Sequence, residues 1–112
     1  MDLLQVDVLE FGSAAVVTVI GDLDAYTSPR LRRTLNEIAG GGPSSAEVRM
    51  EAVDYVDSFG IGALLEGIRA IDAGGTAVST FVNKRVGRYL EMLGLGAPLH
   101  INADTTVLAA TG

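Results

Sequence analysis

The pattern of apolar and polar positions predicts two strands at the start of the chain. Leu4, Val6 and Val8 alternate with other residues, and residues 16–20 are rich in β-branched side chains, as is typical of strands. Residues 11–14 between them include a glycine and a serine, a composition that favours a turn. The two strands are therefore predicted to form a hairpin.

A helix from about Pro29 to Ala39 is predicted next. The hydroxyl residues Thr27 and Ser28 precede Pro29, and a hydroxyl N-cap followed by proline at the first helical position is a helix start. Apolar residues then recur at helical spacing, at Leu31, Leu35, Ile38 and Ala39. The glycine-rich segment 40–45 ends this helix and forms a loop within one domain.

The middle of the chain predicts a short strand and the strongest helix. Residues 46–50 read as the strand, and residues 53–56 lead to the turn Asp57-Ser58-Phe59-Gly60. An amphipathic helix follows, because apolar residues recur at spacings of three and four, at Ile61, Leu64, Leu65, Ile68 and Ile71. It ends near residues 72–75, where glycines occur.

The last third predicts a strand over residues 76–82 and a third helix that Asn83 caps. One face of that helix is apolar, with Val86, Leu90 and Leu93, and Gly94 closes it. A short strand near residues 99–101 and a helix over about residues 104–110 complete the pattern.

The alternation of strands and helices predicts the α/β class. We expect one domain over residues 1–112, with a small mixed sheet of four to five strands. The sheet begins with the hairpin, continues with parallel strands joined by right-handed crossovers, and is covered by about four helices.

Composition supports a single globular domain and narrows its chemistry. The 112 residues are 48% hydrophobic and 20% charged, a globular balance. The chain has no cysteine, which excludes disulfides and thiol chemistry. The net charge of −6 disfavours nucleic acid and anionic membranes and favours a basic partner surface. No apolar stretch approaches a membrane span and residues 1–7 lack a secretory pattern, so a cytoplasmic location is expected.

Residues suited to catalysis are scarce. His100 is the only histidine, and a lone histidine is more often structural or at the surface than catalytic. Asp22 and Asp24 are two residues apart, which permits an acid–base pair or a hard-cation site. The favoured interpretation is that they stabilise the following helix and fix its loop. The sequence therefore predicts a protein that is not an enzyme and has no cofactor or metal.

Ser58 has two interpretations. A serine before an apolar-periodic helix is an ordinary N-cap, and local physics favours that role. The alternative is an exposed hydroxyl that a kinase phosphorylates, at a helix N-terminus that tolerates a dianion. Beside Asp57, the new charge and its hydration would disturb any surface that docks there.

Three segments together resemble one family. They are residues 21–31, which begin Gly-Asp-Leu-Asp, residues 57–64, which begin Asp-Ser-Phe-Gly, and residues 86–95, which end Met-Leu-Gly-Leu. In this order and spacing, nearly the whole chain resembles the STAS family, the domain shared by bacterial anti-sigma factor antagonists and the cytoplasmic parts of sulphate transporters.

The resemblance implies a partner-switching role in transcription regulation and stress response. An antagonist of this type binds an anti-sigma factor that is also an ATP-dependent serine kinase, and thereby frees a sigma factor. Phosphorylation of the serine that matches Ser58 ends the binding, and a PP2C-type phosphatase restores it. ATP belongs to the partner, and the antagonist is a monomer or weak dimer. The implied docking residues are Asp22, Asp24, Tyr26, Asp57, Ser58, Phe59, Gly60 and Ile61.

Two departures from the family pattern keep an alternative open. Phe59 stands where the family often has a second serine or threonine, and residues 49–52 replace the usual aspartate and leucine before the turn. The alternative is a scaffold subunit that is not phosphorylated, in a lipid-transport ABC complex or a stress-signalling assembly. The apolar ring of Phe59 favours that alternative.

Overall fold

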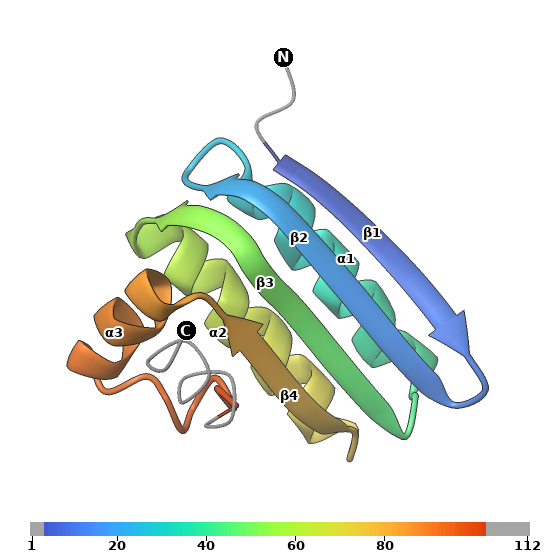
Figure 1. The fold of residues 1–112 in the computed structure, drawn as a ribbon. Coiled ribbons are helices and arrows are strands. Elements are labelled where there is room, and N and C mark those ends of the chain that lie inside the picture. Colours follow the sequence, from blue (N-terminus) through green and yellow to red (C-terminus); the bar gives the residue numbers. More distant parts are fainter. Residues whose placement is uncertain (1–3, 103–112) are drawn as a thin grey trace.

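The computed structural model describes residues 4–102 as a sheet packed against helices (Figure 1). The elements are β1 (Leu4–Phe11), β2 (Ala14–Leu23), α1 (Ser28–Gly41), β3 (Ser45–Val56), α2 (Ser58–Ala73), β4 (Ala77–Val82) and α3 (Lys84–Met92). The strand order is β1-β2-β3-β4; β1 and β2 are antiparallel, and the other two pairs are parallel. The predicted α/β class, hairpin and parallel crossovers are confirmed.

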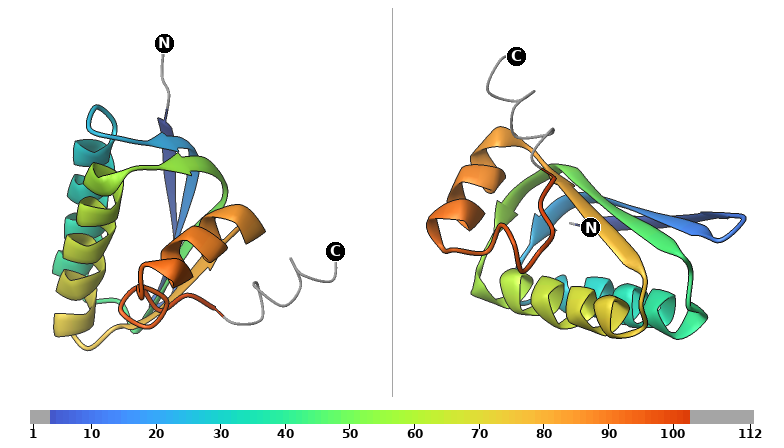
Figure 2. Two further views of the ribbon diagram at one scale, coloured as in Figure 1. Left: turned by 90° about the vertical axis from the view of Figure 1, so that its left-hand side faces the viewer. Right: turned by 90° about the horizontal axis from the view of Figure 1, so that it is seen from below.

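The core lies between one face of the sheet and the helices. In β2 the alternating residues Ala15, Val17 and Val19 are buried, which is the periodicity of a strand with one covered face. Helices α1 and α2 lie side by side against that face (Figure 2), and they contribute Leu35 and Ile68 among others to the same apolar cluster. The periodic apolar positions predicted for these two helices are therefore the ones that form the core.

Strand β3 is much longer than the predicted strand over residues 46–50. Relative to β2 it has one extra residue between Arg49 and Ala52 and another between Val53 and Tyr55. Each extra residue is a bulge that shifts the following side chains to the other face. The inward residues after the first bulge are thus spaced by three rather than two. The alternation that predicts a strand is therefore absent from the second half of β3.

The predicted last strand near residues 99–101 is reduced to a single parallel bridge between Thr80 and Ile101. Thr80 supports it by donating its N–H to the carbonyl of His100 (2.9 Å) and its hydroxyl to the carbonyl of Leu99 (2.6 Å). The predicted helix over residues 104–110 lies outside the described residues. The part of the chain that the structure describes thus has four strands and three helices.

Helix α3 is shorter than its apolar pattern suggests. Val86 and Leu90 are buried as predicted, but α3 ends at Met92 and the side chain of Leu93 is half exposed. The placement of Leu93 on the buried face is therefore wrong, because the helical spacing no longer applies beyond the last helical residue. Over residues 4–102, none of the helices has the length and apolar character needed to cross a bilayer.

A glycine allows α1 and α2 to pack closely. A Cβ atom added at Gly67 of α2 would lie 2.5 Å from both Cβ and Cδ1 of Leu35 in α1. Such distances are far below van der Waals contact, so the absence of a side chain at Gly67 sets the spacing of the helix pair.

This packing predicts opposite effects for one substitution at two sites of α2. Gly67→Ala should lower the free energy of unfolding by about 1–3 kcal/mol, because overpacking forces the helices apart. Gly62→Ala, where an added Cβ meets nothing within 4 Å, should raise it by about 0.5–1 kcal/mol through helix propensity. Urea denaturation followed by circular dichroism measures both, and equal changes in the two variants would contradict the packing argument.

Candidate functional site

The ends of three parallel strands place the candidate residues at one edge of the sheet. β2, β3 and β4 are parallel, so their carboxyl ends meet at the same edge (Figure 1), where open α/β sheets bind their ligands. The segments that follow or end these strands are residues 22–27, 54–61 and 83–92. We call this region the carboxyl edge.

The loop between β2 and α1 is organised by Asp24. Its carboxylate accepts hydrogen bonds from the backbone N–H groups of Tyr26 and Thr27, both at 2.9 Å. The Thr27 hydroxyl donates to the carbonyl of Asp22 (2.6 Å) and does not cap α1. Thr27 is thus the N-cap residue as predicted, but its hydroxyl makes no capping hydrogen bond. The expectation that an aspartate fixes the loop is confirmed for Asp24.

These hydrogen bonds favour the ionised form of Asp24. The backbone N–H of Thr27 is the main cause that lowers the pKa of the Asp24 carboxyl, partly opposed by desolvation. A lowered pKa in the folded state stabilises the fold above the ordinary pKa, and that contribution is lost as the pH falls through the lowered value. At neutral pH the loop holds Tyr26 outward, with 85% of its surface exposed.

The turn between β3 and α2 is capped by Asp57. Its extended backbone lets the carboxylate accept from the N–H groups of Phe59 (2.9 Å) and Gly60 (3.0 Å). Ser58 is the first helical residue, is exposed, and its hydroxyl makes no hydrogen bond within residues 4–102. The prediction that Ser58 caps α2 is wrong, because the residue before it already has this role.

Gly60 joins the turn to the neighbouring loop. A Cβ atom at Gly60 would lie 2.7 Å from the carbonyl oxygen of Leu23 at the end of β2. The same oxygen accepts a hydrogen bond from the N–H of Asp57 (3.0 Å). Gly60 is buried and Ile61 packs partly against the core, so these two residues position the turn. Phe59 projects outward, with 60% of its surface exposed.

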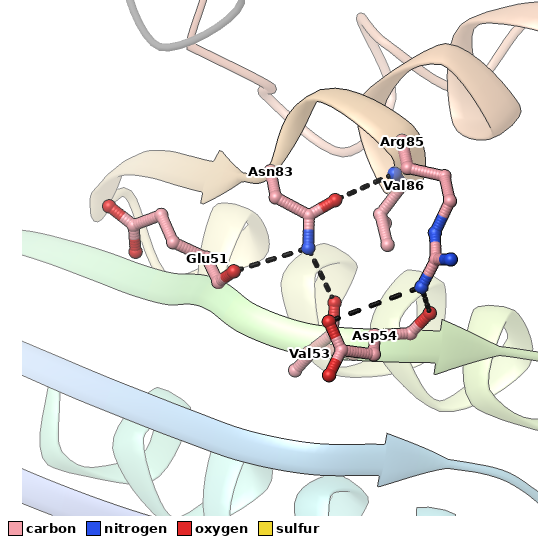
Figure 3. A network of polar contacts seen from close by, with 6 residues as sticks. All are labelled: Glu51, Val53, Asp54, Asn83, Arg85 and Val86. Carbon is pink, nitrogen blue, oxygen red and sulfur yellow. Dashed lines mark hydrogen bonds and ion pairs between the residues drawn. The ribbon is translucent and has the colours of Figure 1, made fainter. Parts of the chain in front are cut away.

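Asn83 fixes the start of α3 to β3 (Figure 3). Its amide nitrogen donates to the carbonyls of Glu51 (3.1 Å) and Val53 (2.8 Å), and its amide oxygen accepts from the N–H of Val86 (2.9 Å). The prediction of Asn83 as a helix cap is confirmed. These three bonds hold the first turn of α3 beside the end of β3.

A groove separates α3 from the turn that carries Ser58. Its volume is about 790 Å³, and its lining residues are Asp54, Tyr55, Val56, Asp57, Ser58, Arg85, Val86 and Tyr89. A second hollow of about 500 Å³ adjoins it on the outer face of α3, lined by Lys84, Arg85, Arg88, Tyr89 and Met92.

Tyr55 and the outer face of α3 were not among the residues predicted for the site. Residues 85, 88, 89 and 92 are spaced by three and four, so they share the face opposite to the buried one. The predicted alternation of strands and helices, with parallel strands, also implied that the segment after β4 lies beside the ends of the other two strands. These two signals combined could have placed α3 at the site.

Charge is divided across the carboxyl edge. Acidic residues come from the ends of β2 and β3, the β2–α1 loop and the β3–α2 turn: Asp22, Asp24, Asp54 and Asp57. Basic residues come from α3: Lys84, Arg85 and Arg88. The expectation of a basic partner surface suits only the first half, since α3 would attract acidic groups.

Within residues 4–102, no base forms a hydrogen bond with the Ser58 hydroxyl that could activate it. His100 instead pairs with Asp72, at 2.7 Å, near the other end of α2, about 20 Å away along a helix of this length. Residues 4–102 contain no cluster of three or more histidine, cysteine or acidic side chains that could hold a metal ion. An unactivated exposed hydroxyl suits modification by another protein better than nucleophilic attack by this one.

The assignment of the cap predicts which substitution destabilises α2. Asp57→Ala should lower the free energy of unfolding by about 1 kcal/mol, because two N–H groups lose their acceptor. Asp57→Asn keeps an oxygen acceptor and should lower it by less, and Ser58→Ala should change it by less than about 0.5 kcal/mol. Urea titrations measure the free energy of unfolding of all three variants. A larger decrease in Ser58→Ala than in Asp57→Ala would show that Ser58, and not Asp57, is the cap.

Comparisons with known proteins agree with this arrangement. A model of the STAS domain matches residues 5–107. The anti-sigma-B factor antagonist of Staphylococcus aureus (strain NCTC 8325 / PS 47) is 34% identical over 92 residues, which cover 81% of this chain and 85% of that protein.

Solved structures share the fold. An anti-sigma factor antagonist from Mycobacterium paratuberculosis has a TM-score of 0.79 and 19% identity, covering 97% of this chain and 95% of that one. The anti-sigma factor antagonist SpoIIAA in its unphosphorylated form has a TM-score of 0.69 and 16% identity, covering 96% of both chains. The phosphorylated form of SpoIIAA from Bacillus has a TM-score of 0.63 and 16% identity, covering 96% of this chain and all of that one. Because the family model spans nearly all of its 112 residues, the chain belongs to the STAS domain family.

Proposed function

We propose that this chain is an anti-sigma factor antagonist whose binding is switched by phosphorylation of Ser58. The observation that carries the proposal is the exposed, unbonded hydroxyl of Ser58 at the first residue of α2. The name of the Staphylococcus aureus relative and the two forms of SpoIIAA support it. The switch acts on one domain that extends over residues 1–112.

The docking surface in this proposal is the carboxyl edge around Ser58. Tyr26, Tyr55 and Phe59 expose 85%, 53% and 60% of their surfaces there, and exposed aromatic side chains are frequent anchors of protein interfaces. Asp22, Asp24 and Asp57 give this part of the edge its negative charge. A partner with basic groups opposite them associates faster and in a defined orientation.

The partner is an anti-sigma factor with serine kinase activity, and it supplies the ATP. The Ser58 oxygen attacks the γ-phosphorus of ATP, the bond from that phosphorus to the bridging oxygen breaks, and ADP leaves. The hydroxyl proton passes to a base of the partner, since Ser58 has no base bonded to it in residues 4–102. A PP2C-type phosphatase then hydrolyses the ester with water and returns serine and inorganic phosphate.

Phosphorylation ends the binding through charge and hydration. It adds about −1.5 to −2 charges at neutral pH, next to the carboxylate of Asp57 and among exposed aromatic side chains. A partner surface shaped for the hydroxyl must then bury a hydrated dianion, which costs several kcal/mol unless cations pair with it. In the cytoplasmic cycle that we propose, the unphosphorylated chain binds the anti-sigma factor and a sigma factor is released.

The exposed ring of Phe59 favours a second candidate. A constitutive scaffold subunit of a lipid-transport or stress-signalling complex needs a permanent apolar contact rather than a second phosphorylatable residue. In that case the carboxyl edge binds its partner without modification of Ser58.

Incubation with kinases separates the two candidates. The purified chain should gain one phosphoryl group when mixed with ATP and the anti-sigma kinase encoded near its own gene, as measured by intact-mass spectrometry. Ser58→Ala should gain none and should bind the kinase whether or not ATP is present, whereas Ser58→Glu should bind poorly. Ser44→Ala, at an exposed serine before β3, is the matched control and should be phosphorylated normally. If the wild type stays unmodified with every candidate kinase, the switch is refuted and the scaffold is favoured.

Two phenylalanines test the location of the docking surface. Phe59→Ala should weaken binding of the anti-sigma factor about tenfold or more, because an exposed aromatic anchor is lost. Phe11 is 56% exposed but ends β1 at the hairpin, at the opposite edge of the sheet. Phe11→Ala is therefore the control and should bind normally in isothermal titration calorimetry. Equal losses in the two variants would refute the carboxyl edge as the docking surface.

A further inference from the structure

Two of the N–H groups at the N-terminus of α2 that could bind a phosphoryl group on Ser58 are already occupied. Helix N-termini bind anions through their free N–H groups, but here the Asp57 carboxylate accepts from the N–H groups of Phe59 and Gly60. A phosphoserine dianion would lie directly beside this carboxylate. It would therefore have to displace Asp57 or find a cation on another element.

The groove beside Ser58 offers one cation. Ser58 and Arg85 both line it, from α2 and α3 respectively, and Arg85 is the one basic residue among its eight lining residues. The volume of about 790 Å³ is ample for a phosphoryl group, since one water molecule occupies about 30 Å³ in the liquid. A phosphoryl group that turns from Asp57 into the groove therefore approaches Arg85.

Arg85 is held weakly enough to change partners. Its guanidinium lies 4.0 Å from the Asp54 carboxylate, and the two side chains are 75% and 78% exposed. Exposed pairs of this kind contribute little to stability. The guanidinium also donates one N–H to the Asp54 carbonyl at 2.7 Å (Figure 3). Because arginine has five N–H donors, this bond can remain while other donors turn to a phosphate.

The backbone of Arg85 is already in place. Asn83 ties the first turn of α3 to the carbonyls of Glu51 and Val53 (Figure 3). The start of α3 is therefore fixed, and the movement that the contact asks for is a rotation of the exposed Arg85 side chain. Pre-positioning of this kind lowers the entropy cost of forming a contact.

We propose that Arg85 receives the phosphoryl group of phosphorylated Ser58, so that the groove is a binding site for a phosphomonoester dianion of the same chain. The inference rests on the proposed function, because it needs phosphorylation of Ser58. The contact places the phosphate inside the groove that Tyr55 and Tyr89 also line, so that a partner can no longer enter this part of it. The phosphorylated chain is thus held in a form that cannot rebind.

The second pKa of the phosphoryl group reports which neighbour it faces. The carboxylates near it are Asp57 on its own turn, Asp54 on β3 and Asp24 in the adjacent loop, and all raise this pKa. Arg85 lowers the pKa because it favours the dianion, so the sign of the shift separates the two arrangements.

The experiment uses the full chain with phosphoserine incorporated at position 58 during synthesis, without any kinase. Phosphorus NMR over a pH titration should give a second pKa below about 6, the ordinary value. Arg85→Gln should raise it by roughly one unit. Arg88→Gln, one turn further on the outer face of α3 and outside the groove, is the matched control and should leave it nearly unchanged. An unchanged pKa in Arg85→Gln, or an equal rise in both variants, would overturn the inference.

A second readout needs no substitution. The Nε–H resonance of Arg85 should shift and become protected from exchange in the phosphorylated wild-type chain, and the absence of any change would also overturn the inference. Neither measurement involves a kinase. If kinases leave Ser58 unmodified, the proposed function fails while the contact can still be observed. If Ser58 is phosphorylated by the kinase but Arg85 does not respond, only the inference fails.

Discussion

The contact between Gly60 and Leu23 is the constraint on which the carboxyl edge depends. An added Cβ at Gly60 would meet the Leu23 carbonyl oxygen at 2.7 Å, and that oxygen also accepts the Asp57 N–H. The start of α2 can therefore lie directly on the end of β2 only because Gly60 has no side chain. This close approach places the loop of Asp24 beside the turn of Ser58, so two segments more than thirty residues apart form one surface.

Periodicity predicted most of the fold, and failed where local geometry interrupts it. The apolar spacing of α2 and the alternation in β2 gave the correct elements, since each buries one regular face. The two bulges of β3 shift its inward residues and so erase the pattern of a strand. Adjacent capping candidates could not be separated either, because the choice between Asp57 and Ser58 depends on one residue's backbone angles rather than on composition.

The candidate site was predicted in part for a similar reason. Asp24, Ser58 and Phe59 follow strand ends with recognisable turn composition, so their position at the edge of the sheet was accessible from the sequence. The outer face of α3 was not predicted, because its residues form no core and their spacing points to the site only in combination with the topology. The net charge of −6 is likewise an average that conceals the basic face of α3. The charges at this edge form a dipolar pattern, which specifies the orientation of a partner more strictly than a uniform surface does.

The cap of α2 belongs to Asp57 and the candidate phosphorylation site to Ser58, and this division affects any switch at this position. If Ser58 capped α2, phosphorylation would remove a helix cap and would change stability by about 1 kcal/mol together with binding. Because Asp57 holds the N–H groups of Phe59 and Gly60, α2 begins in the same way whether or not Ser58 is modified. The same carboxylate denies those N–H groups to a phosphate. One aspartate thus keeps the serine hydroxyl available and leaves its phosphorylated form without a counter-charge on its own turn, so the modification alters the surface while the fold beneath it stays the same.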